Sequence, residues 1–338
     1  MRIAVAGLGF MGSTHIKALQ AIPEAQLFAV VSDVPEKLAG DLSGVQGNLD
    51  RPGEKHDFSQ VRKYRNIKDA LRDPDIEAFD LCLPTHLHAE IAIEALRAGK
   101  HVLVEKPMAL DGTEADAMIK AARESGRILM VAQVLRFFPA YVPLREYVDS
   151  GRLGQVKCAS FRRRCAAPTW SKWLSDTERS GGAVVDLLIH DIDMCLHLFG
   201  MPEAVSATGH EDLPRGIDWI TARLHYPNVP EVVVAGGWLH PKAYPFVMEY
   251  TVTFEEGTVD YSSAYRPPAL YRVDGCDETV KLPETDGYEA EIRYFLECCR
   301  ENRQPEFCPP EMSAAAVKLA RLLRTARAKN GELVPCKL

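Results

Sequence analysis

Short apolar runs alternate with amphipathic stretches over the first 135 residues of the chain. The apolar runs predict strands over residues 2–6, 26–32, 64–66, 78–83, 101–105 and 128–134. Apolar residues at helical spacing predict helices over residues 11–22, 35–42, 67–72, 88–98 and 113–125. Residues 44–57 interrupt this rhythm, and their glycine, proline and charged positions predict an exposed loop. Strands that alternate with helices predict a parallel sheet that is covered on both faces.

The pattern changes after about residue 135. Helices are predicted over 139–150 and 182–199, with a strand over 156–164 between them. Strand-like runs separated by proline, glycine and asparagine then follow, over 204–209, 219–226, 231–239, 248–254, 258–261 and 270–273. Helices over 288–301 and 310–330 close the chain. The sequence therefore predicts an α/β protein, with a doubly wound parallel sheet in residues 1–135. Residues 136–338 are expected to form an α+β domain with a large, mostly antiparallel open sheet.

Composition supports a globular chain of about two domains, because 338 residues carry 46% hydrophobic and 26% charged positions. The net charge of −7 is a poor match for a nucleic-acid backbone or an anionic membrane. No apolar run approaches the ~20 residues that span a bilayer, and the charged, glycine-rich start is unlike a signal peptide. Nine scattered cysteines without metal-ligand spacing predict buried thiols in a reduced protein, so we expect a cytoplasmic location and no metal.

A glycine-rich sequence, Gly7-Leu8-Gly9-Phe10-Met11-Gly12, lies between the first predicted strand and the first predicted helix. In this context the first glycine permits a tight turn, the second lets a pyrophosphate approach the backbone, and the third lets the helix pack closely. The helix N-terminus supplies N–H groups for the phosphates. Asp33 follows the second strand, where a carboxylate binds a ribose 2′-hydroxyl and repels a 2′-phosphate. The motif predicts dinucleotide binding, with NAD preferred over NADP.

The strand over 101–105 leads into Glu105-Lys106-Pro107. Ligands of open parallel sheets bind at the carboxyl ends of the strands. A lysine at this edge can hold a substrate oxygen or take part in proton transfer, and Pro107 can fix the turn with a cis peptide bond. Taken alone, this sequence favours a surface lysine before a proline.

The predicted helix over 182–199 places four ionisable residues on one stripe, Asp186, His190, Asp193 and His197. Asp186 and His190 are four residues apart, so the carboxylate can orient the imidazole for acid–base chemistry. Two other interpretations remain open at this point: a solvated helix face, and a site for a divalent metal.

Together these sequences resemble the glucose–fructose oxidoreductase / inositol dehydrogenase / rhizopine-catabolism family, Gfo/Idh/MocA. The resemblance rests on residues 7–15, 84–90, 104–110, 133–139, 180–193, 288–295 and 314–326. It implies a Rossmann domain followed by a substrate-binding and oligomerisation domain, with the reaction between the two domains. It also implies catalytic roles for Lys106, Asp186 and His190, and a structural role for Asp193.

The resemblance extends the cofactor-binding set beyond the glycine-rich sequence, to Leu83, Pro84, Thr85, His88, Glu105 and Lys106. Thr85 stands where the family more often has asparagine, and Leu83 where it more often has threonine. Substrate contacts are expected from Lys106, Asp186 and His190, and from three further residues: Arg136, Tyr141 and Trp173. A run of three arginines, Arg162-Arg163-Arg164, is predicted to alternate between the two faces of a strand.

The reaction that the resemblance implies is hydride transfer between a nicotinamide and a secondary alcohol or ketone of a polyol, inositol or sugar-like substrate. His190 would take the hydroxyl proton, with Lys106 stabilising the charge on the same oxygen. Two alternatives from the same family are an NAD-dependent glycoside hydrolase and a cofactor-binding regulatory protein. The expected assembly is a homodimer or homotetramer formed through the C-terminal sheet.

Overall fold

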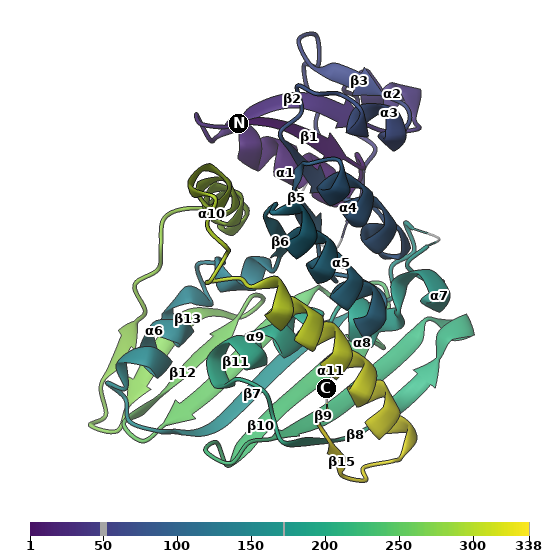
Figure 1. The fold of residues 1–338 in the computed structure, drawn as a ribbon. Coiled ribbons are helices and arrows are strands. Elements are labelled where there is room, and N and C mark those ends of the chain that lie inside the picture. Colours follow the sequence, from purple (N-terminus) through teal and green to yellow (C-terminus); the bar gives the residue numbers. More distant parts are fainter. Residues whose placement is uncertain (48–52, 172, 338) are drawn as a thin grey trace. The chain divides into compact units, whose positions relative to one another are not determined.

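The computed structural model describes residues 1–47, 53–171 and 173–337. These residues form two compact units (Figure 1). The first unit contains Met1–Val134 and Thr285–Ala314, and the second contains Leu135–Glu284 and Ala315–Leu338. The chain thus crosses into the second unit near residue 135 but later returns to the first. This return differs from the two continuous segments, 1–135 and 136–338, that the sequence suggested.

The first unit is built on a six-stranded sheet in the order β3-β2-β1-β4-β5-β6, and every pair in it is parallel. This confirms the predicted doubly wound sheet. Its strands are β1 (Arg2–Ala6), β2 (Gln26–Val31), β3 (Arg62–Tyr64), β4 (Ala78–Leu81), β5 (His101–Glu105) and β6 (Leu129–Ala132). The core strands are buried on both faces, as the continuous apolar runs predicted.

Helices and one 3₁₀ turn connect these strands. They are α1 (Phe10–Gln20), α2 (Pro35–Leu38), α3 (Ile67–Leu71), η1 (Thr85–Leu87), α4 (His88–Arg97) and α5 (Gly112–Ser125). The second helix is shorter than predicted because the chain turns at Gly40, which has a positive φ of 94°. The predicted loop over 44–57 contains residues 48–52, which lie outside the described part of the chain.

Helix α10 (Gly287–Glu301) belongs to the first unit although it follows the second unit in sequence. Asp286 caps it by accepting hydrogen bonds from the N–H groups of Tyr288 and Glu289. Its buried face includes Ile292 and Phe295, and it packs against α1 and β6. The apolar face of α10 therefore completes the core on one side of the parallel sheet.

The second unit contains a nine-stranded sheet in the order β14-β13-β12-β11-β7-β10-β9-β8-β15. All its pairs are antiparallel except β7 with β10, which confirms the mostly antiparallel prediction. The strands are β7 (Val156–Cys165), β8 (Ala204–Asp212), β9 (Ile217–His225), β10 (Glu231–Trp238), β11 (Val247–Phe254), β12 (Gly257–Ser262), β13 (Arg266–Arg272), β14 (Asp277–Thr279) and β15 (Val334–Pro335). The sequence did not predict β14 and β15, because two or three residues are too few to show a period.

The remaining helices are η2 (Val134–Arg136), α6 (Val142–Ser150), α7 (Thr177–Ser180), α8 (Gly182–Asp186), α9 (Ile189–Phe199), η3 (Leu213–Arg215) and α11 (Pro310–Ala328). The single helix predicted over 182–199 is wrong, because the structure has two helices with a turn at Leu187 and Leu188. None of the described helices is long and apolar enough to cross a membrane.

Candidate functional site

The loops that follow β1, β4 and β5 lie side by side at the carboxyl edge of the parallel sheet. The register pairs Ala6 with Leu81 and Leu81 with Val104, so the three strands end at the same level. The strand order changes direction at β1, between β2 and β4 (Figure 1). Open α/β sheets bind ligands at such a switch point, outside the carboxyl ends of their strands. This edge is therefore the candidate site of the first unit.

The three glycines after β1 have different surroundings. A Cβ added to Gly7, whose φ is +93°, would lie 2.4 Å from the carbonyl oxygen of Cys82. One added to Gly12 would lie 2.0 Å from the carbonyl oxygen of Gly7. Among the described residues, no atom lies within 4 Å of a Cβ added to Gly9, so in that part of the chain space is open beside its backbone. The loop is thus tight at its first and third glycines and free at the second, as a pyrophosphate requires.

The N-terminus of α1 is suited to a phosphate. Gly9 caps the helix without a side chain, and its first turn contains no acidic residue. The N–H groups and the partial positive charge of this helix end therefore face no competing carboxylate from the helix itself. Phe10 and Met11, the first two helical residues, are half-buried, and Asp33 is exposed two residues beyond the end of β2.

His88 joins the loop after β4 to the turn after β5. Its Nε2 lies 2.8 Å from the carbonyl oxygen of Leu83, and its Nδ1 lies 2.9 Å from that of Pro107. Both contacts are hydrogen bonds only if both nitrogens carry a proton, whereas burial lowers the pKa of His88. The neutral ring donates one bond and contacts the second carbonyl. Thr85, three residues before His88, is also buried, and its hydroxyl has no hydrogen-bond partner among the described residues. A polar atom of a bound cofactor can therefore hydrogen-bond to this hydroxyl.

The turn after β5 contains the predicted lysine. The peptide bond between Lys106 and Pro107 is cis, in agreement with the sequence analysis. Glu105 is buried, and its Oε2 accepts a hydrogen bond of 2.9 Å from the backbone N–H of Lys106. The Lys106 side chain is half-buried. The glutamate thus restrains the backbone of Lys106 at the same edge as the glycine-rich loop.

Asp186 and His190 belong to the second unit and lie on either side of the turn between α8 and α9. Asp186 is buried, and its charge helps to raise the pKa of the nearby Cys165 thiol, whose main cause is burial. His190 is half-buried at the start of α9. The pair is therefore held at a helix junction rather than along one continuous helix.

The other two residues of the predicted stripe are buried among protein groups. Asp193 accepts hydrogen bonds of 2.8 and 2.7 Å from Arg136, and both side chains are almost fully buried. His197 is 6% exposed, and burial lowers its pKa to about 3. The interpretation of this stripe as a solvated face is therefore wrong. Arg136, predicted to contact substrate, is engaged with Asp193 in the structural role expected for that aspartate.

Two further predicted substrate residues lie in different environments. Tyr141 is 1% exposed and packs edge-on against Tyr250 and Tyr261, at ring distances of 5.1 and 5.8 Å. Burial raises the pKa of Tyr141. Trp173 is half-buried in the turn before α7, where its carbonyl accepts a hydrogen bond from the N–H of Asp176. Of the two, Trp173 retains more surface for a ligand.

Sequence analysis missed a cluster of ionisable groups behind the Lys106 turn. Asp80, Glu291 and His15 are all buried, and His15 contacts both carboxylates as well as Glu105. A signal for Asp80 was present, since a carboxylate in the middle of a fully buried strand needs a partner. Glu291 had a weaker signal, because it lies on the apolar face of α10 between Tyr288 and Ile292.

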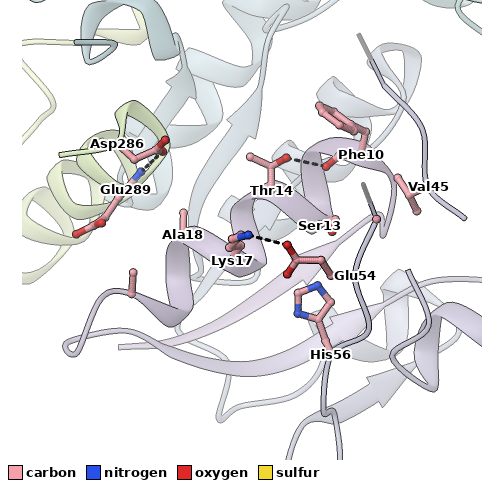
Figure 2. Close-up of a pocket in the computed structure, with 12 residues that line it drawn as sticks. Phe10, Ser13, Thr14, Lys17, Ala18, Val45, Glu54, His56, Asp286 and Glu289 are labelled. Atoms are coloured by element: carbon pink, nitrogen blue, oxygen red, sulfur yellow. Dashed lines mark hydrogen bonds and ion pairs between the residues drawn. The ribbon is translucent and has the colours of Figure 1, made fainter. Parts of the chain in front are cut away.

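A pocket of about 470 Å³ lies along α1, away from the carboxyl ends of β4 and β5. Figure 2 shows Lys17 turned toward Glu54 and Thr14 turned toward the backbone of Phe10, with Asp286 and Glu289 on the neighbouring helix. Lys17 pairs with Glu54 at 2.6 Å, Thr14 donates to the carbonyl of Phe10, and Asp286 caps α10. These groups are used within the protein, so we place no ligand in this pocket.

Two family models match the chain. The model described as an oxidoreductase family with an NAD-binding Rossmann fold, GFO_IDH_MocA, matches residues 1–133. The model of the GFO/IDH/MocA C-terminal domain matches residues 141–260. Their order and positions correspond to the two sheets of the structure.

Two enzymes are similar to this chain in sequence, and one solved structure is similar to it in fold. A myo-inositol 2-dehydrogenase of Thermotoga maritima is 32% identical over 200 residues, which cover 59% of this chain and 55% of that enzyme. A scyllo-inositol 2-dehydrogenase (NADP(+)) of Bacillus subtilis is 24% identical over 87% of this chain and 76% of that enzyme. A solved levoglucosan dehydrogenase in complex with NADH and L-sorbose has the same fold, with a TM-score of 0.85 and 21% identity over 99% of this chain and 98% of that one.

Proposed function

The chain belongs to the Gfo/Idh/MocA oxidoreductase family, and on this basis we propose that it is a nicotinamide-dependent dehydrogenase of a polyol, inositol or sugar-like secondary alcohol. One observation carries the proposal: the open backbone at Gly9 and the Lys106 turn occupy the same edge of the parallel sheet. The named relatives act on inositols and the solved neighbour binds a sugar, which supports this substrate class.

The residues fit a dinucleotide. Gly7, Gly9 and Gly12 would shape the cradle for a pyrophosphate, and Phe10 and Met11 begin the helix whose N-terminus would hold it. The edge is completed by Leu83, Pro84, Thr85, His88, Glu105 and Lys106. A bound nicotinamide supplies the acceptor for the hydride. The exposed Asp33 favours NAD, because its carboxylate would repel a 2′-phosphate. One named relative uses NADP, so this preference is part of the proposal.

The chain's own residues supply proton handling. His190 takes the hydroxyl proton of the substrate while Asp186 orients and stabilises the imidazolium. Lys106 donates a hydrogen bond to the same oxygen and stabilises its negative charge as the hydride leaves. Trp173 covers the substrate. Arg136 and Tyr141 are buried and support the substrate-binding part of the second unit from within its core.

Substitution of the base tests the proposal. His190→Ala should lower kcat by about 10²- to 10⁴-fold, the usual contribution of general acid–base catalysis. Exposed His210 provides the matched control, and His210→Ala should leave kcat unchanged. A screen of polyols, aldoses and sugar acids with NAD and with NADP, followed by absorbance of the reduced cofactor, identifies the substrate for this measurement.

The outcomes separate the alternatives. Net formation of reduced cofactor supports a dehydrogenase, whereas cleavage of a glycoside without net reduction identifies a hydrolase that regenerates its cofactor. Cofactor binding without turnover of any substrate indicates a regulatory protein. Equal kcat values for His190→Ala and His210→Ala would remove His190 from the catalytic set.

Assembly and location complete the proposal. We propose a homodimer or homotetramer formed through the nine-stranded sheet. The side chains of Arg162 and Arg164 lie on one face of this sheet, and the buried side chain of Arg163 lies on the other. All nine cysteines are free thiols, which supports a reducing, cytoplasmic location.

A further inference from the structure

Three elements of the first unit bring carboxyl groups to the imidazole of His15 in α1. Its Nδ1 lies 2.9 Å from Asp80 in β4. Its Nε2 lies 3.1 Å from Glu105 at the end of β5 and 3.8 Å from Glu291 in α10. The side chain of His15 is fully buried, and those of the three carboxylates are no more than 7% exposed. Three carboxyl groups therefore share one imidazole in a region without solvent.

Electrostatics fix the charge on two members of this cluster. Despite burial, the nearby Asp80 carboxylate raises the pKa of His15 well above its ordinary value of 6.5. Burial opposes ionisation of Glu105, but the close contact with His15 and the charge of the imidazolium lower the pKa of Glu105 below 4.5. His15 is thus an imidazolium. Its Nδ1–H donates to Asp80, whereas its Nε2 forms an ion pair with Glu105 and has no hydrogen-bond partner of good geometry among the described residues.

Glu291 is in a different state. Neither of its carboxyl oxygens has a hydrogen-bond partner among the described residues, and its side chain is fully buried. Burial raises its pKa well above 4.5, and the charges of Glu105, Asp80 and Asp286 add to this, whereas His15 opposes it. An ionised carboxylate without hydrogen bonds is strongly disfavoured in such surroundings. Glu291 therefore carries a proton at neutral pH.

The remaining neighbours do not change this assignment. Cys82, the first residue after β4, lies 3.6 Å from Nδ1 of His15, and burial raises the pKa of its thiol, so the thiol stays protonated. The ring of Tyr288 in α10 is 6.0 Å from the imidazole. The ammonium group of Lys106 favours the ionised form of Glu105. His15, Asp80 and Cys82 also lie close enough together to hold a metal ion. If they did, the purified protein would contain stoichiometric metal.

The cluster is connected to the proposed active site through Glu105, whose Oε2 accepts the backbone N–H of Lys106. We propose that His15 is a positioning residue that holds Lys106 through its ion pair with Glu105, and that protonated Glu291 leaves the Nε2 side of the imidazolium to Glu105 until alkaline pH ionises Glu291. Ionised Glu291 then competes with Glu105 for the charge of the imidazolium, and Lys106 loses its restraint. The inference rests on the role of Lys106 given under the proposed function.

Two variants on α10 test the proton on Glu291. Glu291→Gln keeps the shape and neutrality of the side chain but cannot ionise, so the alkaline limb of the kcat–pH profile should move up by about one pH unit. Glu297→Gln removes a half-exposed carboxylate from the same helix and should leave the limb in place. An unmoved limb in Glu291→Gln, or an equal shift in both variants, would overturn the proposal.

A measurement on the cofactor-free protein gives an independent readout. Infrared spectra at neutral pH should contain the carbonyl band of a buried, protonated carboxyl group, and this band should be absent from Glu291→Gln and present in Glu297→Gln. Absence of the band from the unmodified protein would contradict the proposal whether or not either variant folds. Stoichiometric bound metal that depends on Cys82 would also contradict it, because a metal ion would replace the proton between His15 and Asp80.

His15→Asn tests the connection to Lys106. It should lower kcat by about 10- to 100-fold, the effect expected when a reacting group is misplaced, while KM for the cofactor changes little. Lys106→Met separates this inference from the proposed function. If Lys106→Met abolishes turnover and His15→Asn does not lower it, the inference fails alone. If Lys106→Met leaves turnover intact, the proposed role of Lys106 fails.

Discussion

The three glycines of the glycine-rich loop are the same residue type but have different roles. The sequence placed Gly7, Gly9 and Gly12 in one motif, and general knowledge of that motif assigned them three functions. The surroundings now give each assignment a physical basis, since backbone oxygens crowd Gly7 and Gly12, whereas no atom of the described residues crowds Gly9. The difference separates the residues that the fold needs from the one that a ligand needs.

Alanine substitutions should distinguish these roles. At Gly9, φ is −88° and an added methyl group meets open space, so Gly9→Ala should fold with little change in thermal midpoint but bind NADH at least about tenfold more weakly, a loss of 1.4 kcal/mol. At Gly12, the methyl group would overlap the carbonyl oxygen of Gly7, so Gly12→Ala should lower the thermal midpoint. Calorimetry and fluorescence titration with NADH measure the two effects. Equal midpoints for the two variants would contradict this assignment.

The arginine run shows what sequence can and cannot predict at this scale. Strand alternation correctly separated Arg163 from its two neighbours. It could not identify the partners: Arg163 is buried against Asp191, at 2.8 Å, whereas Arg162 and Arg164 both pair with Glu249. These partners lie 28 to 87 residues away in sequence, and no local period encodes such a pairing.

At the scale of elements, most strands and helices followed from hydrophobic period, but the helix over 182–199 did not. No glycine or proline marks its interruption between Asp186 and Ile189. The backbone N–H groups of Leu187 and Leu188 both donate to the carbonyl of Ala183, which disturbs the regular ladder. Leu187 packs with Cys165 and Trp238 in a buried cluster, so tertiary packing overrides the local preference.

The buried pair of Arg136 and Asp193 links the chain after β6 to α9. Asp193→Asn would leave a buried guanidinium without its charged partner, so unfolding free energy should fall by about 3–5 kcal/mol. Replacing both residues together, Arg136→Met with Asp193→Leu, should recover most of this loss, because no unpaired charge remains. Urea unfolding of the single and double variants measures the effect. If Asp193→Asn instead keeps full stability and loses turnover, the pair serves catalysis rather than structure.

On the scale of the whole molecule, the sequence predicted two sheets and a change of character near residue 135. It did not predict that α10 returns to the first unit, because hydrophobic period shows which face of a helix is buried but not which sheet covers it. The same limit concealed the His15 cluster, whose members lie in α1, β4, β5 and α10. Groups that distant segments bring together are visible only in three dimensions.

Burial of histidines also sets how stability of the whole protein depends on pH. The pKa of His197 is lowered to about 3 by burial, with smaller contributions from the charges of Arg136 and Arg145. In the unfolded chain the same group takes up a proton near its ordinary value of 6.5. Between pH 3 and pH 6.5 the unfolded state therefore binds more protons than the folded state. The contribution of His197 to the free energy of unfolding is complete above pH 6.5 and is lost as the pH falls. The loss should be about 1.4 kcal/mol for each pH unit below 6.5.

His197→Gln removes this titration. The variant should lose stability at neutral pH, because its side chain fits the buried site less well, but its unfolding free energy should fall less steeply between pH 6.5 and pH 5. The difference in unfolding free energy between His197→Gln and the unmodified protein should therefore become smaller as the pH falls. His210→Gln, at an exposed position, should retain the slope of the unmodified protein. Urea unfolding at a series of pH values measures these slopes, and parallel curves for His197→Gln and the unmodified protein would show that His197 takes up its proton without unfolding.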